Sequence, residues 1–239
     1  MSITAEVLIS QRKKNKLGSI ARKHNGELVH FYDQGKDQRT KKDDLTSGGW
    51  CFAMSNYWLS YDDTADFWLW FETEESEQRL RAQMARQAIV KATLIAAKGS
   101  DKNPDFRWSD QYKQKIGFNV DMENAARQDD RNLLKKILRN AGLNPMEEHY
   151  KWGDEASGYW RLAQIITTSP RTKFAIAYWY TGGGAHQTAG RLSHNRFIYM
   201  DPNLGEFSIP EDNISDFFFD LEFDYQLPRL DSFEVIHCS

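Results

Sequence analysis

The chain has 239 residues and a mass of 27.8 kDa, which is enough to bury one sizeable core. Its 31 Lys and Arg nearly balance its 34 Asp and Glu, which excludes the basic footprint of a nucleic-acid-binding or lipid-binding protein. The mean hydropathy of -0.70 is polar, yet 13% of the residues are aromatic, a share that disordered chains do not carry. We expect a folded protein with an aromatic core and a charged surface.

The cysteines and the apolar runs indicate the cellular compartment. Cys51 and Cys238 are too few for a disulfide framework, so we expect reduced thiols. At the N-terminus the basic residues follow the apolar patch, which is the wrong order for a signal peptide. The longest apolar runs, such as 174–180, are far shorter than the roughly 20 residues that span a bilayer. We expect a protein made in a reducing cytoplasm, with no transmembrane segment.

The first 45 residues differ in texture from the rest of the chain. Residues 1–45 are mostly polar and charged, and we expect a loosely structured N-terminal segment with one short strand at 28–32. From residue 46 the sequence is that of a globular domain that continues to residue 239. A buried helix is predicted to begin at Cys51, because positions 51, 54, 55 and 58 recur at helical spacing.

Helices come before strands in the remaining sequence. Strong helix formers predict a helix over 74–98, and apolar periodicity predicts another over 122–141 and a short one over 157–168. After Pro170 the period changes to two, which predicts strands over 173–180, 185–191, 195–200, 205–209 and 233–237. The fold class is therefore α+β, with a helical part followed by a twisted antiparallel sheet.

Cys51 has the placement of a nucleophilic thiol. The N-terminus of a helix favours a thiolate, because its unpaired N–H groups and macrodipole lower the pKa of the thiol. Two glycines precede the cysteine, which permits close approach of a substrate backbone, and the Cys51 amide would face a developing oxyanion. The alternative is that Cys51 is a small buried apolar residue at the head of a core helix.

A catalytic thiol needs an imidazole that is oriented by a carboxylate or amide. Of the six histidines, His186 opens a predicted strand after a glycine-rich turn, and the next strand ends at Asp201. Two adjacent antiparallel strands would hold these side chains together. His194, in the turn between the strands, ranks second as the base. The alternative for Asp201 and the two residues after it is an ordinary strand-ending turn.

Three segments in this order carry a resemblance. They are Gly48-Gly49-Trp50-Cys51-Phe52-Ala53-Met54-Ser55-Asn56-Tyr57-Trp58-Leu59, then Gly184-Ala185-His186-Gln187-Thr188-Ala189, and then Asp201-Pro202-Asn203-Leu204-Gly205-Glu206-Phe207. Over residues 46–239 the chain resembles the YopT-like, AvrPphB-type cysteine peptidases, which are papain-fold bacterial virulence effectors. The third segment is the most specific match. The resemblance implies a papain-like catalytic domain over 46–239.

The same resemblance implies a role for each matched residue. Cys51 would be the nucleophile, His186 the general base and acid, and Asp201 the residue that orients His186. The oxyanion donor expected a few residues before the cysteine has only Thr46 or Ser47 as candidates, with Gln38 and Gln34 further back. Gln187 and Thr188 depart from the apolar pair that the family shows after its histidine.

The implied activity is hydrolysis of a peptide bond in a protein of a host or rival cell, through a thioester. Such an effector or toxin is made in the bacterial cytoplasm and then secreted or injected, and a cognate chaperone or immunity protein is a further implied partner. No ligand spacing predicts a metal, and no cofactor is expected. The same triad would also serve an amidase, deamidase or transglutaminase. A binding module without catalysis is the non-enzymatic alternative.

Overall fold

The computed structural model describes residues 3–41, 50–97, 135, 138–139, 142–153, 158–168, 173–180, 185–225 and 230–239. The chain divides into two compact units. The first unit comprises Met1–Lys36 and Met146–Ser239, and the second comprises Asp37–Pro145.

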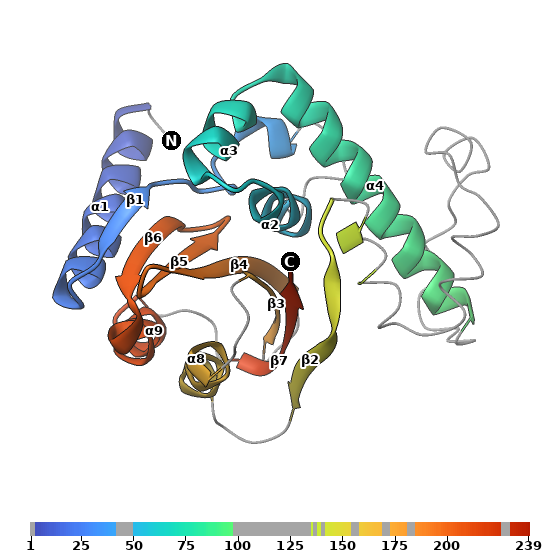
Figure 1. The fold of residues 1–239 in the computed structure, drawn as a ribbon. Coiled ribbons are helices and arrows are strands. Elements are labelled where there is room, and N and C mark those ends of the chain that lie inside the picture. Colours follow the sequence, from blue (N-terminus) through green and yellow to red (C-terminus); the bar gives the residue numbers. More distant parts are fainter. Residues whose placement is uncertain are drawn as a thin grey trace. The chain divides into compact units, whose positions relative to one another are not determined.

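The first unit is built on a seven-stranded sheet with the strand order β1-β6-β5-β4-β3-β7-β2 (Figure 1). The strands are β1 (Glu27–His30), β2 (Pro145–Gly153), β3 (Lys173–Tyr180), β4 (Ala185–Ser193), β5 (Arg196–Asp201), β6 (Gly205–Pro210) and β7 (Leu230–Cys238). In this sheet order, every neighbouring pair from β1–β6 to β3–β7 is antiparallel. Short turns join β4 to β5 and β5 to β6, so these three strands form a meander.

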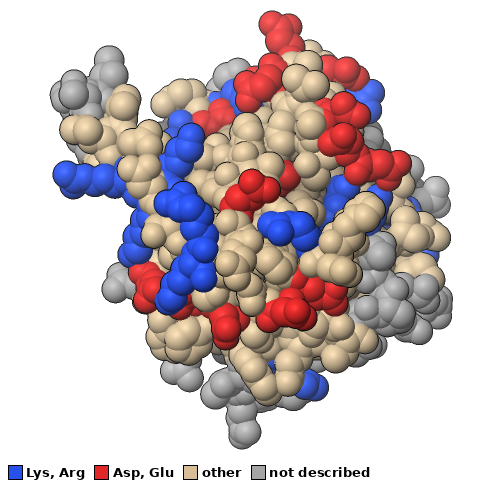
Figure 2. Space-filling model, turned by 60° about the vertical axis from the view of Figure 1, so that its left-hand side comes forward, with Lys and Arg blue, Asp and Glu red and all other residues tan. Residues whose placement is uncertain are grey.

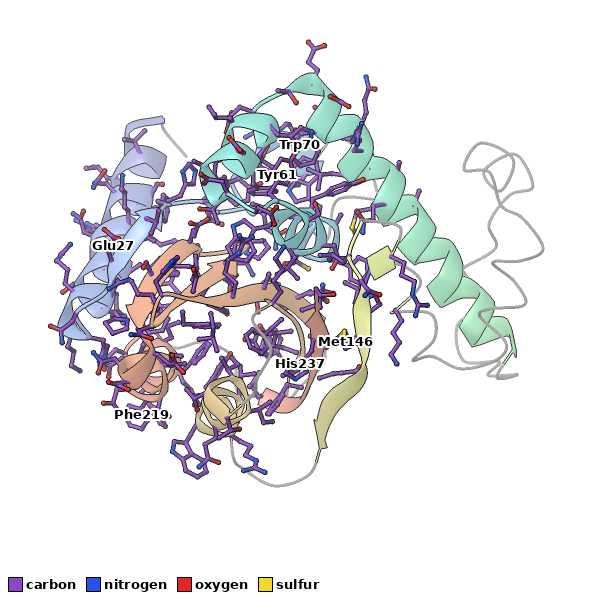
Figure 3. All side chains as sticks on the ribbon, in the orientation of Figure 1. Glu27, Tyr61, Trp70, Met146, Phe219 and His237 are labelled. Atoms are coloured by element: carbon purple, nitrogen blue, oxygen red, sulfur yellow. The ribbon has the colours of Figure 1, made fainter. Side chains whose placement is uncertain are left out.

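Three helices of this unit pack on the sheet: α1 (Ile3–Lys23), α8 (Gly158–Thr168) and α9 (Ile214–Phe223). Figure 1 shows α8 and α9 together on one face of the sheet, with α1 beside β1. The core between helices and sheet is largely aromatic, as the composition predicts. Its fully buried aromatic side chains are Tyr159, Phe174, Tyr178, Phe197, Tyr199, Phe207, Phe217, Phe218 and Phe233. Phe219, labelled in Figure 3, is on the exposed side of α9.

The N-terminal segment differs from the expected loose structure over residues 1–45. Residues 3–23 form α1, and its Leu17, Ile20 and Ala21 are buried in the core of the sheet unit. Their i, i+3, i+4 spacing is the signature of one buried helix face. Five basic residues over 12–22 make the composition of this segment polar, although one helix face is apolar. The strand expected at 28–32 is present as β1, one edge of the sheet. The division of the chain at residue 46 stays a prediction.

Asp220 of α9 binds Lys23, the last residue of α1, and His24, which follows it. His24 Nε2 lies 2.6 Å from Asp220 Oδ2, and Lys23 Nζ approaches the same oxygen at 2.6 Å. Burial raises the pKa of the Asp220 carboxyl, but the hydrogen bonds from Lys23 and His24 outweigh burial and hold that pKa below its ordinary value. Asp220 is therefore ionised at neutral pH, and it holds the end of α1 through charge-assisted hydrogen bonds.

Gly205 allows the chain after β1 to pass directly against the turn between β5 and β6. Its φ of +109° lies in the region that favours glycine. A Cβ at this position would overlap the His30 carbonyl oxygen and lie 2.9 Å from the Tyr32 amide nitrogen. Both obstacles are backbone atoms, which cannot rotate away.

We expect Gly205→Ala to lower the free energy of unfolding by about 3 kcal/mol, because an unfavourable φ and a backbone overlap act together. Gly142 is a matched control: its φ is +84° but nothing lies within 4 Å of its added Cβ. Gly142→Ala should cost only about 1 kcal/mol. Urea denaturation of both variants measures the difference. Equal losses would show that β1 and the turn are not in close contact.

The second unit contains the helices α2 (Cys51–Ser60), α3 (Thr64–Phe71) and α4 (Glu74–Ala97) and the 3-10 helix η1 (Gln38–Lys41). Asp63 caps α3, with its Oδ1 accepting from the Ala65 amide at 2.8 Å. Aromatic contacts fill the space between α2 and α3. Tyr61 and Trp70, labelled in Figure 3, lie with their ring centroids 5.6 Å apart.

Most of the predicted elements are confirmed. The helices that begin at Cys51 and at Glu74 and the helix over 158–168 are present, and so are the five predicted strands after Pro170. The helix α3 and the strand β2 were not predicted. The helix expected over 122–141 falls largely outside the described residues, of which Lys135, Leu138 and Arg139 are helical. In the described part of the chain, no helix is both long and apolar enough to cross a membrane.

Candidate active site

Cys51 is the first residue of α2, in the second unit. Seven of the ten residues of this helix are buried, so the helix is firmly held in its core. Cys51 itself is only partly buried. The intrahelical bonding starts at once, with the Met54 amide donating to the Trp50 carbonyl at 2.9 Å. The thiol therefore stands on the first turn of a fixed helix, where the amide dipoles stabilise a thiolate.

Trp50, immediately before the cysteine, is immobilised by an arginine. Its ring is fully buried, lies edge-on to Phe71 at 6.2 Å, and has the Arg39 guanidinium 5.3 Å from its centroid. Arg39 is in turn bound by Asp37 and by the Phe71 carbonyl at 2.8 Å. These contacts fix the backbone from which α2 starts, and with it the Cα of Cys51.

His186 and Asp201 form a buried pair in the first unit. The Nε2 of His186 lies 2.8 Å from Asp201 Oδ1, and the two side chains are 5% and 4% exposed. His186 is the second residue of β4 and Asp201 the last of β5, and these two strands are neighbours in the sheet. The His186 ring also stacks on Tyr178, its cross-strand partner on β3, at 6.4 Å between centroids. The sequence prediction that adjacent strands bring these two residues together is confirmed.

The turn after β5 holds the Asp201 carboxylate from the other side. Asp201 Oδ1 accepts the backbone amide of Asn203 at 2.7 Å, and the Asp201 carbonyl accepts the amide of Leu204 at 2.9 Å. The carboxylate oxygen that faces the histidine is thus bound by two donors. These bonds form an Asx turn. Asp201 therefore ends the strand in an ordinary turn and also contacts the histidine.

Buried hydroxyls line the second oxygen of the carboxylate. Tyr199 donates to Asp201 Oδ2 at 3.4 Å, the Tyr178 hydroxyl lies 3.4 Å from that of Tyr199, and Thr188 donates to Tyr178 at 3.3 Å. Burial raises the pKa of both tyrosines, which therefore stay protonated donors at any physiological pH. Thr188, one of the departures noted in the sequence, supplies the hydroxyl at the end of this chain.

The orientation of the imidazole decides what chemistry it performs. Because Nε2 faces a carboxylate, the tautomer with its proton on Nε2 donates a hydrogen bond to Asp201 and leaves Nδ1 as the acceptor nitrogen. A neutral imidazole so oriented is a base, and once protonated at Nδ1 it is stabilised by the Asp201 charge.

The remaining site candidates are distributed as follows. His194, the second-ranked candidate for the base, lies exposed in the turn between β4 and β5 at a φ of +51° and contacts Ser193. Thr46 and Ser47, the tentative oxyanion donors, lie outside the described residues, as does the glycine run at 182–184. Gln38 begins η1. Gln34 is buried beside Asn203.

Asn203 and Tyr199 contact the His186 and Asp201 pair directly but were not assigned by the sequence. Asn203 Nδ2 lies 3.4 Å from His186 Nε2. Its place two residues after Asp201 is the available signal, because an Asx turn folds the third residue back over the first carboxylate. For Tyr199 the signal is the period of two, which puts it on the same face of β5 as Asp201.

The second cysteine differs sharply from the first. Cys238 is buried at the end of β7, and burial raises the pKa of its thiol to about 12. At neutral pH this thiol therefore stays protonated, which makes Cys238 a poor nucleophile.

Within the described ranges, no three His, Cys, Asp or Glu side chains gather as metal ligands would. Figure 2 shows charges of both signs on the face that it presents, in keeping with the even charge balance.

Comparison with known proteins places these features in a family. The model of the peptidase C58 family, described as Yersinia/Haemophilus virulence surface antigen, matches residues 18–238. A protein of Bradyrhizobium diazoefficiens, named as a candidate YopT-like cysteine protease, is 32% identical over 85 residues, 34% of this chain and 28% of that protein. A similarly named protein of Sinorhizobium fredii is 32% identical over 95 residues, 39% of this chain and 35% of that protein. These matches span about a third of the length of each relative.

The fold comparison agrees with the family match. The crystal structure of the Pseudomonas avirulence protein AvrPphB aligns with a TM-score of 0.54 and 16% identity, and covers 82% of this chain and 95% of that one. At this identity the alignment speaks for the fold alone, and it confirms the predicted papain-like α+β architecture. The family match begins at residue 18, before the domain start predicted at residue 46, and so includes the end of α1, β1 and Gln34. The chain belongs to the peptidase C58 family of YopT-like cysteine proteases.

Proposed function

We propose that this chain hydrolyses peptide bonds with Cys51 as nucleophile, His186 as general base and acid, and Asp201 as the residue that orients His186. The observation that carries the proposal is the buried 2.8 Å contact between His186 Nε2 and Asp201 Oδ1. Family membership and the position of Cys51 at the start of α2 support it. A buried carboxylate that points an imidazole in this way is the usual device for activating a thiol.

The reaction has two halves. In the first half, His186 Nδ1 takes the thiol proton and Sγ of Cys51 bonds to the carbonyl carbon of the scissile peptide. His186 then gives this proton to the leaving amine as the C–N bond breaks, which leaves a thioester. In the second half, His186 takes a proton from water and the hydroxide adds to the thioester carbon. The C–S bond then breaks, and His186 returns the proton to Sγ, which regenerates the thiol and the neutral imidazole.

Two groups would stabilise the oxyanion that forms in each half. The backbone amide of Cys51 is at the helix N-terminus and supplies one donor. A side chain among the residues before the cysteine, with Thr46 or Ser47 as the candidates, would supply the other. The substrate we propose is a protein of a host or rival cell, reached after secretion or injection from the bacterium, and the further partner is a cognate chaperone or immunity protein.

The experiment is a search for new protein N-termini. Purified chain and its Cys51→Ala variant are each incubated with a plant-cell and an animal-cell extract, and N-terminal peptides are enriched and identified by mass spectrometry. The proposal predicts new N-termini with the native chain that are absent with Cys51→Ala. Release of ammonia without new N-termini would overturn peptide hydrolysis and assign the site to an amidase or deamidase. If neither new N-termini nor ammonia is formed, and Cys51 reacts like an ordinary thiol, catalysis itself is overturned.

A further inference from the structure

The segment that follows β1 is bonded to the turn that carries Asp201. The Gln34 backbone amide donates to the Pro202 carbonyl at 2.9 Å, and the Gln34 side-chain Nε2 donates to Asn203 Oδ1 at 2.8 Å. From α1, Lys13 Nζ donates to the Asn203 carbonyl at 2.6 Å. Two residues of the turn are therefore held at three points by residues that precede the predicted catalytic domain.

These contacts are built into the interior. Gln34 is 5% exposed, and the Lys13 ammonium is paired with Asp33 at 2.7 Å. At the end of the same turn, the backbone of residues 30–32 passes so close to Gly205 that a side chain at this position would overlap it. Buried amides of this kind are costly to leave without partners. The pairing of Gln34 with Asn203 is thus an ordered feature of the site.

Asn203 is the link to the reacting groups. Its backbone amide binds Asp201 Oδ1 at 2.7 Å, and its side-chain amide lies 3.4 Å from His186 Nε2. Gln34 binds both the Pro202 carbonyl and the Asn203 side chain, so it holds the residue whose backbone amide binds Asp201 and whose side chain lies against His186. The side-chain oxygen and nitrogen of Gln34 and of Asn203 can be exchanged together without losing their hydrogen bond. After the exchange, Asn203 Nδ2 donates to Gln34 Oε1.

We propose that Gln34 is a positioning residue of the active site. By fixing the side-chain amide of Asn203, Gln34 keeps Asp201 Oδ1 aligned with His186 Nε2, and so stabilises the imidazolium that pairs with the Cys51 thiolate. This inference rests on the proposed function. It makes the segment before residue 46 part of the catalytic apparatus.

The test is the pH dependence of Cys51 alkylation by iodoacetamide, measured on the full chain by mass spectrometry. Gln34→Met keeps the length of the side chain and removes its hydrogen bonds. With a less stable imidazolium the thiolate forms less readily, so the midpoint of the rate profile should move about one pH unit toward alkaline values. The rate at pH 6 should then fall about tenfold. At pH 9.5, where the thiol is ionised in both proteins, the rates should be similar.

Two further variants separate positioning from mere stability. His24→Ala breaks the buried contact of α1 with Asp220 and so loosens the same N-terminal segment away from the turn; its alkylation midpoint should equal that of the native chain. In Gln34→Glu the new carboxylate can accept from Asn203 Nδ2, and it adds a negative charge. The alkylation midpoint of this variant should therefore stay at or below the native value. Gln34→Glu also provides the comparison with native chain if Gln34→Met does not fold.

The outcomes are distinct. A Gln34→Met midpoint equal to the native one, or a Gln34→Glu midpoint shifted to alkaline values, would overturn the positioning role while the proposed function stands. An equal shift in His24→Ala would reduce the effect to loss of stability and would also overturn it. A native profile with the midpoint of an ordinary thiol, near pH 8.5, would instead refute the activated cysteine itself.

Discussion

Replacing His186 with alanine is expected to lower the rate of Cys51 alkylation at pH 6 by about 100-fold. In the proposed mechanism a His186 imidazolium favours the thiolate below the ordinary thiol range; without it, Cys51 would have only the helix terminus to stabilise its charge. At pH 9.5 the two rates should converge. Peptide hydrolysis should be lost at every pH, because no other group exchanges the proton.

The same experiment contains its own controls. Cys238 should remain unlabelled at pH 6, because burial raises the pKa of its thiol to about 12. His194→Ala, a change of the exposed histidine in the turn between β4 and β5, should leave the rate unchanged. If His186→Ala and the native chain react equally fast at pH 6, His186 does not activate Cys51.

Asp201→Ala is expected to lower kcat for peptide hydrolysis by about 10³-fold. The substitution removes the acceptor for His186 Nε2 and for the Asn203 amide, so the imidazole loses both its orientation and the charge that stabilises its protonated form. It should also lower the free energy of unfolding by about 3 kcal/mol, because buried donors lose their acceptor.

Comparison with two variants tells these effects apart. Asp201→Asn keeps an oxygen that can accept from Nε2, so orientation survives without the charge, and the loss in kcat should be smaller than for Asp201→Ala. Asp220→Ala is the matched control for stability, because Asp220 is also a buried carboxylate bonded to the Nε2 of a histidine. Steady-state kinetics on a peptide identified in the N-terminal search, with urea denaturation alongside, measures both quantities. Equal loss of kcat in Asp201→Ala and Asp220→Ala would contradict a specific role for Asp201.

The sequence sufficed for the strands after Pro170 and for the pair of His186 and Asp201, because both depend on local patterns. A period of two identified β4 and β5, and a short turn between them required the two strands to be neighbours. His186 and Asp201 then had to lie on adjacent strands. The helix α3 was not predicted because it is short and five of its eight residues, Phe67 to Phe71, form one apolar run from which no helical period can be read.

The supports of the pair could not be predicted, because they depend on contacts between distant segments. Gln34 and Asn203 are 169 residues apart in the chain, and His24 and Asp220 are 196 apart. The polar and charged composition of the N-terminal segment favours the prediction of a loose structure there. Leu17, Ile20 and Ala21 are enough to bury one face of α1, while Arg12, Lys14, Lys16, Arg22 and Lys23 are exposed.

The central claim, that Cys51 and His186 act as one coupled unit, is tested most directly by NMR titration of the His186 imidazole. Spectra are recorded for the native chain and for chain whose Cys51 is blocked with methyl methanethiosulfonate, with a His186→Gln variant to assign the signal. Blocking removes the negative thiolate, so the imidazolium loses its partner and should release its proton at a pH at least one unit lower. An identical His186 titration before and after blocking would contradict the coupling.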